Sequence, residues 1–294
     1  MEINVNANGA NVFWTLGEDT DADFLEEQLS ALKLSFGKLA PKKNSDKAAL
    51  HIATKRVCAN RRRLVRPLPS GIHGYAVVNE DQDDNGKSLD HSVDFDVLFL
   101  QGGDNTPVFQ DPQTGELIFP QEANAILGRY ATERQRCNSH KVGIMLAKIV
   151  DRLHGVSLRP TGGYYWIPEQ KVPLMESVAQ IVRKSSPSGR NTVYFMRTVL
   201  DESGKVAVID GLVRQLTSEL ESIEAQVEEV DEDGKRAMKK RGLKTKQERC
   251  ERLHNRVRGY EKMFQTKLDS LRETVERVEE ATTFAALEAM GDAQ

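Results

Sequence analysis

The sequence lacks every common catalytic and cofactor-binding motif. Its three cysteines and six histidines never approach the C-x-x-C or H-E-x-x-H spacing of zinc sites, and no G-x-S-x-G stretch is present. Cys137 and His140 lie three residues apart, which we interpret as coincidence rather than as a nucleophile with its base. We therefore expect no metal and no cofactor, and we favour a non-enzymatic protein.

Long apolar runs are also missing. No window approaches the roughly eighteen apolar residues that a membrane-spanning helix needs, and the first stretch, MEINVNANGANVFWTLGED, has no basic segment followed by an apolar one. The cysteines, Cys58, Cys137 and Cys250, are odd in number and far apart, which suits unpaired thiols in a reducing compartment. These absences predict a cytoplasmic protein that does not associate with membranes.

Charge is segregated although the net charge is only -3. Residues 1–32 hold seven acids and no Lys or Arg, whereas residues 33–66 hold eleven Lys and Arg and the single acid Asp46. A uniformly solvated surface does not sort its charges in this way. The two segments are thus candidates for pairing with each other or with a charged partner.

Hydrophobic periodicity predicts an α+β fold: a mixed body of antiparallel sheets in two lobes, followed by a C-terminal antiparallel helical hairpin of the coiled-coil kind. Helical spacing follows the capping residue Ser45, and Val93, Phe95, Val97 and Phe99 alternate as in a strand. The expected domains are an α+β lobe over 1–120, a helix–ribbon–helix–strand lobe over 121–203, and the helical arm over 204–294.

The arm carries an apolar seam at steps of three and four residues. Its two helical segments, about 26 and about 45 residues long, would leave an overhang of roughly 30 Å at 1.5 Å per residue. An apolar stripe on that overhang needs a protein partner or a second copy of the chain, so a homo-oligomer is expected. The candidate interface residues are Leu253, Val257, Tyr260, Phe264, Leu268, Leu271 and Val275.

The stretch KRVCANRRRLVR is the strongest binding signal, because six positive charges in one predicted helix over 55–66 can release counterions from a phosphate backbone. The acidic first helix is the competing, intramolecular partner, and no aromatic residues are interleaved. Nucleic-acid binding and internal salt bridging therefore remain alternatives. The candidate contacts are Lys55, Arg56, Arg61, Arg62, Arg63, Arg66 and Arg159.

The stretch RPTGGYYWIP, from Arg159 to Pro168, predicts a two-stranded ribbon, because adjacent glycines supply positive φ at the turn and aromatic residues favour strands. We favour a ribbon packed on its neighbours. A nucleic-acid-binding wing over 157–167, next to the preceding apolar helix, is an alternative, and so is a grip on a small ligand.

One enzymatic alternative rests on Asp94 and Asp96. Two residues apart on a strand, they would share one face at a separation of roughly 7 Å, which suits a general acid and base or a divalent metal. Their strand has an apolar opposite face, so two solvated carboxylates are the favoured interpretation.

The order of FWTLGE near the start, RPTGGYYWIP in the middle and a helical hairpin at the end resembles a family of uncharacterised proteins of bacteriophages and bacterial mobile elements. The resemblance covers most of the chain and implies no catalytic residues. Together these features predict an interaction or assembly protein that uses the C-terminal arm to oligomerise or to recruit a partner. The alternative is a nucleic-acid-binding protein.

Overall fold

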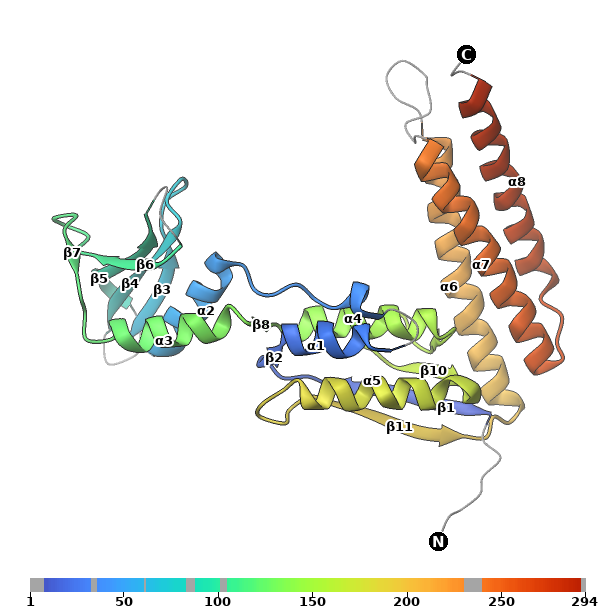
Figure 1. Ribbon diagram of the computed structural model, residues 1–294, viewed down its shortest axis with the longest axis horizontal. Helices are drawn as coiled ribbons and strands as arrows, with labels where there is room; N and C mark the ends of the chain where they lie inside the picture. Colours follow the sequence, from blue (N-terminus) through green and yellow to red (C-terminus); the bar gives the residue numbers. More distant parts are fainter. Residues whose placement is uncertain are drawn as a thin grey trace, which may run out of the picture. The chain divides into compact units, whose positions relative to one another are not determined.

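The computed structural model describes residues 8–32, 36–60, 62–82, 88–100, 105–229 and 240–291. The fold is α+β, with helices and antiparallel sheets, as the sequence predicts (Figure 1). The chain divides into two compact units, each assembled from segments distant in the sequence. Unit 1 comprises Met1–Phe13, Val150–Met175 and Tyr194–Gln294; unit 2 comprises Trp14–Ile149 and Glu176–Val193.

Unit 2 contains an antiparallel sheet with the strand order β3-β4-β5-β6-β7. The strands are β3 (Arg63–Pro67), β4 (Gly74–Gln82), β5 (Ser88–Phe99), β6 (Pro107–Gln110) and β7 (Leu117–Ile118). Helices α2 (Asp46–Cys58) and α3 (Ala123–Glu133) lie side by side on one face of this sheet (Figure 1). The buried residues between them include Leu50, Ala53, Val77, Phe95, Val97, Phe109 and Ile126. Strands β4 and β5 form one antiparallel hairpin, and β6 and β7 form another.

Helix α2 begins where the sequence predicts. Ser45 is the N-cap, and its Oγ accepts a hydrogen bond from the Ala48 amide at 3.3 Å. The prediction of one helix through residue 66 is wrong, because α2 ends at Cys58 and the basic run continues into β3. Leu64 lies opposite Val78 in the ladder, so pairing with β4 satisfies backbone groups that a longer helix would have used internally.

The rest of unit 2 is mainly helical. It includes α1 (Ala22–Ser30), the 3₁₀ helix η1 (Phe36–Leu39), the β2 (Thr20–Asp21) pairing with β8 (Arg136–Cys137), and parts of α4 (Ser139–Arg152) and α5 (Val172–Lys184). Helices α3 and α4 are separated near Cys137, which lies in β8. The N-cap of α1 is Asp21 rather than the neighbouring Thr20, because the Asp21 carboxylate accepts from the Phe24 amide at 3.0 Å. The Thr20 hydroxyl instead accepts from the Asn191 amide group.

Most of the second sheet belongs to unit 1, with the strand order β11-β1-β10-β9. The strands are β11 (Thr192–Thr198), β1 (Gly9–Thr15), β10 (Tyr165–Pro168) and β9 (Val156–Ser157), and the 3₁₀ helix η2 (Glu169–Lys171) follows β10. The predicted ribbon is present, because β9 and β10 pair antiparallel. Its Trp166 is fully buried, and the ring packs on Tyr260 and Phe264 of the C-terminal arm.

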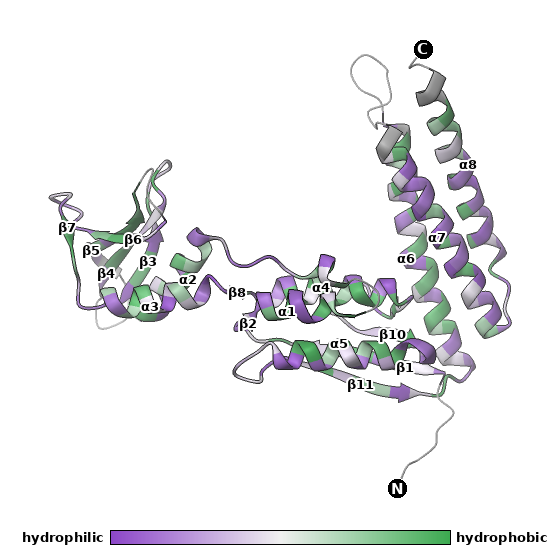
Figure 2. Cartoon of the chain, in the orientation of Figure 1, coloured by the Kyte–Doolittle hydropathy of each residue, from purple (hydrophilic) through white to green (hydrophobic). Residues whose placement is uncertain are grey.

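The C-terminal arm consists of α6 (Glu202–Glu228), α7 (Lys240–Phe264) and α8 (Asp269–Gly291). Figure 1 shows the three helices side by side, with α7 running back along α6 and α8 reversing again. Hydrophobic residues recur between hydrophilic ones along all three (Figure 2), and those that face inward form one continuous buried cluster. The expected 45-residue second segment is wrong.

The helix breaks after Phe264 because Gln265 takes a positive φ of 52°. The Glu261 carboxylate then accepts a hydrogen bond from the Leu268 amide at 2.9 Å, which replaces one of the bonds lost at the break. The stripe expected to overhang therefore folds back as α8 and is covered by the chain's own α6 and α7.

Candidate functional site

The end of the basic run is neutralised inside unit 2. Arg63 forms ion pairs with Asp94 of β5 and with Glu122, at 2.5 Å for the latter, and its guanidinium lies over the Phe95 ring. The Glu122 carboxyl has a lowered pKa, chiefly because Arg63 donates a hydrogen bond to it. Arg63 is thus held in a structural contact.

The other predicted contacts differ in their surroundings. Arg66 lies 3.4 Å from Glu80, whereas Lys55 and Arg62 are exposed and form no ion pair within the described part of the chain. Arg61 lies outside the described residues. Internal pairing thus accounts for some of the basic run but leaves other cations open to solvent.

Arg56 belongs to a cluster that the sequence did not reveal. Three guanidinium groups surround a single carboxylate oxygen of Glu133: Arg129 at 2.9 Å, Arg136 at 3.1 Å and Arg56 at 3.6 Å. The Glu133 side chain is 1% exposed, while those of Arg56 and Arg129 are 41% and 33% exposed. We call Arg56, Arg129 and Arg136 the arginine cluster. One carboxylate offsets one positive charge, so the cluster carries a surplus of two.

The arginine cluster borders two hollows in unit 2. One, of about 500 Å³, is lined by residues that include Asn44, His51, Lys55, Arg56 and Asn138. The other, of about 570 Å³, lies along α2 and α3. Its lining residues include Arg56, Asn124, Gly128, Arg129 and Thr132. Burial and the neighbouring Lys55 lower the pKa of His51, so this side chain is neutral at physiological pH.

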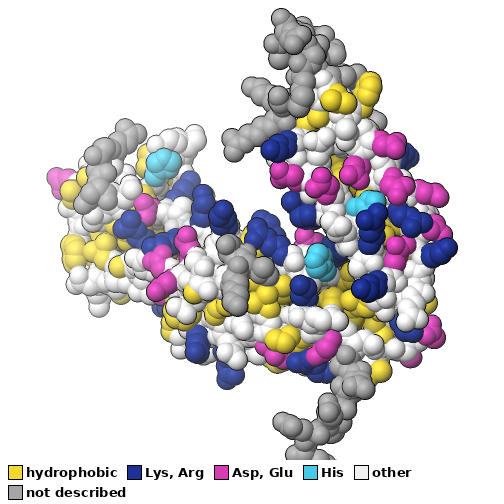
Figure 3. All heavy atoms as spheres, turned by 45° about the vertical axis from the view of Figure 1, so that its right-hand side comes forward, with side chains coloured by type: hydrophobic (Ala, Val, Ile, Leu, Met, Phe, Trp, Pro, Cys, Tyr) yellow, Lys and Arg dark blue, Asp and Glu magenta, His cyan; other side chains and the backbone are white. Residues whose placement is uncertain are grey.

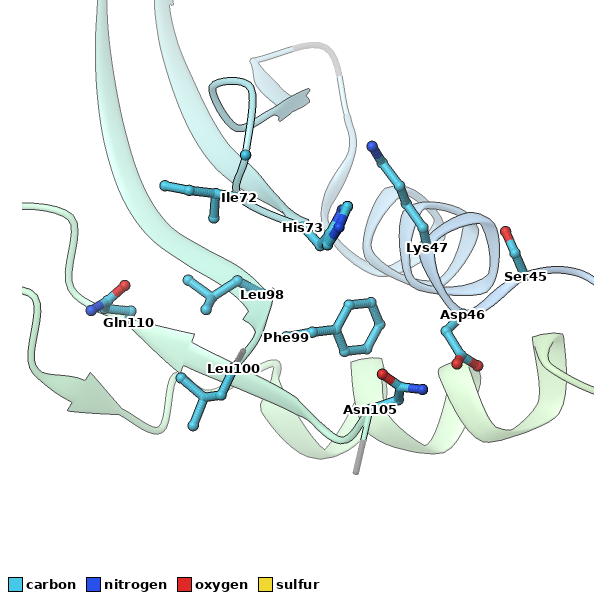
Figure 4. Close-up of a pocket in the computed structure, with 11 residues that line it drawn as sticks. Ser45, Asp46, Lys47, Ile72, His73, Leu98, Phe99, Leu100, Asn105 and Gln110 are labelled. Atoms are coloured by element: carbon cyan, nitrogen blue, oxygen red, sulfur yellow. The ribbon is translucent and has the colours of Figure 1, made fainter. Parts of the chain in front are cut away.

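A third pocket, of about 750 Å³, lies between α2 and the strand ends of the same sheet. Figure 4 shows the Phe99 ring reaching across it toward Asp46, with Lys47 and His73 on another side. Asp46 is already paired with Arg134 at 2.8 Å. The pocket is open and mixed in character, and its groups do not converge on one point.

Asp94 and Asp96 do not form the pair that an enzyme would need. The ladder shifts register between Val77 and Val78, so Asp94 has no opposite residue and the two-residue alternation is broken there. Asp94 is held by Arg63, whereas Asp96 lies opposite Ala76 and burial raises its pKa. The two carboxylates therefore have different environments and partners.

Cys137 is buried, and this burial raises the pKa of its thiol to about 12. Its Sγ contacts the Thr20 carbonyl oxygen at 3.8 Å. A thiol with this pKa is not ionised near neutral pH, which disfavours the nucleophilic alternative. No group of three His, Cys, Asp or Glu side chains arranged to hold a metal ion occurs in the described ranges.

The seam residues predicted for a partner are buried within the arm itself. Their exposed fractions run from 0% to 9%, and they pack against one another and against apolar residues of α6. They are Leu253, Val257, Tyr260 and Phe264 on α7, Leu268 at the turn, and Leu271 and Val275 on α8. A partner would reach them only if the arm opened.

A polar network fastens α6 and α7 to the end of α4 within unit 1. Asp151 accepts from Arg256 at 2.8 Å, from Gln215 at 3.1 Å and from Arg249 at 3.1 Å. Arg249 also forms a two-point pair with Glu219, and Arg256 donates to the Gly155 carbonyl group. Cations near the C-terminus of a helix are favourable, so this network suits the end of α4.

The sequence model of DUF6744, a family of unknown function, matches residues 9–290. The chain belongs to this family. No curated protein and no solved structure matches it. The family match spans both the α2–α3 region and the C-terminal arm, so both features lie within the family's defined extent. Within the described ranges, no helix has the length and apolarity that crossing a membrane requires.

For this DUF6744 member, the arginine cluster is the site that sequence reasoning missed. Glu133 stands among three arginines in the run RYATERQR, so a local excess of basic charge was visible. What could not be read was that Arg56, far away in the sequence, would reach the same carboxylate. That meeting depends on α2 and α3 lying side by side.

Proposed function

We propose that the protein binds nucleic acid through the phosphate backbone, using the arginine cluster on α2 and α3. The observation that supports this proposal most strongly is the surplus of positive charge around Glu133. Arginine presents planar, multiple donors that suit phosphate oxygens, and phosphate groups would offset the charge that Glu133 leaves uncompensated.

Exposure and shape support the same assignment. Arg56 lines both hollows beside the cluster, so a phosphate in either could approach it. Lys55 and Arg62 extend the positive surface without ion pairs of their own in the described part. Glu133 neutralises only part of the charge of the arginine cluster, and Lys55 and Arg62 add further positive charge. Such a surface is expected to bind a polyanion with an affinity that depends strongly on salt.

The test compares two kinds of arginine. The double variant Arg56→Gln/Arg129→Gln should weaken binding to a fluorescein-labelled DNA duplex and reduce the slope of log affinity against log salt by about 2, one for each phosphate contact. Fluorescence anisotropy at several KCl concentrations measures both quantities.

Arg134→Gln is the matched control, because Arg134 is exposed but already paired one-to-one with Asp46. It removes the same type of charge and should leave the slope close to that of the wild type. Absence of salt-dependent binding by the wild type, or an equal loss per residue in the control, would contradict the proposal.

A second candidate function, assembly through the arm, is favoured by one observation. Phe284 and Leu287, one helical turn apart on α8, are 60% and 61% exposed. Figure 3 shows hydrophobic side chains near the upper end of the arm, above a surface of interspersed acidic and basic groups. This exposed pair, rather than the buried seam, is the surface that a second copy would cover.

If assembly occurs there, Phe284→Glu/Leu287→Glu should convert an oligomer into monomers in sedimentation velocity. Val206→Glu is the control, because Val206 is 56% exposed but lies in the first turns of α6. A wild-type protein that is monomeric across the concentration range would exclude this candidate.

The proposal also includes origin and location. We take the family to belong to bacteriophages and bacterial mobile elements, on the stretches FWTLGE and RPTGGYYWIP, and the protein to be cytoplasmic. The cytoplasmic location is supported by three cysteines that are free and buried, as expected in a reducing compartment.

A further inference from the structure

A row of three aromatic side chains crosses neighbouring strands of the unit 1 sheet. Val12 lies opposite Tyr165, and the next residues, Phe13 and Tyr164, have ring centroids 6.0 Å apart. On the other side of Phe13, the Tyr194 ring of β11 is stacked at 5.0 Å with an interplanar angle of 18°. We call Tyr164, Phe13 and Tyr194 the aromatic row.

The aromatic row lies on the sheet face that carries Trp166. Asn11 is opposite Trp166, and side chains alternate along a strand, so Phe13 shares the face of Asn11 while Ala10 and Val12 point the other way. Ala10 and Val12 are completely buried. At Trp166 the face is covered by α7. At the aromatic row it is partly exposed: Tyr194 is 42% exposed, and Phe13 and Tyr164 are half-buried.

An exposed cation, Arg159, lies in the turn that joins β9 to β10. It follows Leu158, whose amide donates to the Tyr164 carbonyl group, and forms no ion pair in the described part. Its guanidinium donates to the Gly162 carbonyl group at 2.6 Å and keeps other donors free. The acids nearest in sequence, Asp151 and Glu169, are both paired with arginines. The ribbon therefore has a local surplus of positive charge.

Rings with positive charge beside them suit one class of ligand. Unpaired nucleic-acid bases stack on aromatic side chains whatever their sequence, because every base has a π face, and a neighbouring cation meets the phosphate. Bases inside a duplex are already stacked and cannot bind in this way.

We propose that the aromatic row is a stacking platform for unpaired bases of single-stranded DNA or RNA, with Arg159 contacting a phosphate. This inference rests on the proposed binding of nucleic acid and adds a preference for single strands. It also gives Arg159 and the glycine turn a role. Gly162 and Gly163 have φ values of 91° and 56°, and they leave the turn beside Tyr164 without bulky side chains.

The experiment measures the affinity of Tyr194→Ala for a labelled oligothymidylate and for a duplex of equal length. We expect the affinity for the single strand to fall about tenfold, as for the loss of one stacked base, with no change for the duplex. Tyr194→Phe keeps the ring and should retain wild-type affinity. Phe119→Ala removes an aromatic residue that is 67% exposed in unit 2 and should change neither affinity.

The outcomes separate this inference from the proposed function. If Arg56→Gln/Arg129→Gln weakens binding but Tyr194→Ala leaves the single-strand affinity unchanged, the platform is refuted and the arginine cluster stands. If the wild type binds neither nucleic acid, both proposals fail. If Tyr194→Ala instead dissociates an oligomer in sedimentation velocity without lowering single-strand affinity, the aromatic row belongs to a contact between copies and the platform is refuted.

Discussion

Replacing Asp151 with Ala is expected to lower the free energy of unfolding by about 3 kcal/mol, because it removes the shared acceptor of two arginines. The Arg256 side chain is 3% exposed, so its charge cannot be solvated once the partner is gone. Arg249 keeps Glu219, and Asp151 itself is 26% exposed, which places the loss at the lower end of the range for broken buried pairs.

Urea unfolding followed by circular dichroism measures this loss. Glu202→Ala is the control, because Glu202 pairs with Lys205 on the same arm but is 89% exposed, and a surface pair contributes about 0.2–1 kcal/mol. A loss no larger for Asp151→Ala than for Glu202→Ala would show that the network does not hold the arm to the end of α4.

The local features of the fold were predictable because each has its cause within a few residues. Ser45 was identified as a cap, and its hydroxyl accepts from the amide three residues on. The alternation of Val93, Phe95, Val97 and Phe99 was likewise identified as a strand, and all four lie in β5. Neighbouring residues determine these helix and strand positions, and the tertiary contacts agree with the local preference.

The features that failed depend on contacts between distant segments. The break after Phe264 falls in FQTKLDS, which contains neither Gly nor Pro, and a glutamine adopts the positive φ. The chain accepts this conformation where the apolar side chains of α8 can fold back onto the arm. Likewise, the basic run leaves its helix at Cys58 because β4 offers a strand to pair with.

The candidate site follows the same division. The sequence identified basic residues on α2 and a turn of two glycines followed by aromatic residues. It could not show which of the basic side chains are neutralised by acids. Asp94 and Glu122 neutralise Arg63, so Arg63 is not a candidate phosphate contact. Arg56 is a stronger candidate, because it shares Glu133 with two other arginines. Net charge in a segment is therefore a weak guide to its binding surface, because the positions of the acids decide what remains.

Trp166→Ala is expected to lower the free energy of unfolding by about 3–5 kcal/mol, the range for deleting a large buried aromatic side chain. Trp166 is 0% exposed, and its ring lies 6.1 Å from that of Tyr260 and 5.9 Å from that of Phe264. Strand β1 packs directly against this ring. A Cβ on Gly9 would lie 2.6 Å from the indole, so β1 can approach Trp166 this closely only because residue 9 is glycine.

The same substitution tests whether the sheet and the arm of unit 1 are stabilised by this contact. Trp166→Phe should cost less than Trp166→Ala, because the indole Nε1 has no hydrogen-bond partner among the described residues and a phenyl ring keeps part of the packing. Tyr194→Ala removes a partly exposed ring that stacks on Phe13, so it should cost the least of the three. Chemical unfolding of the three variants should rank their losses in that order. Equal losses for Trp166→Ala and Tyr194→Ala would mean that the buried ring does not hold the arm against the sheet.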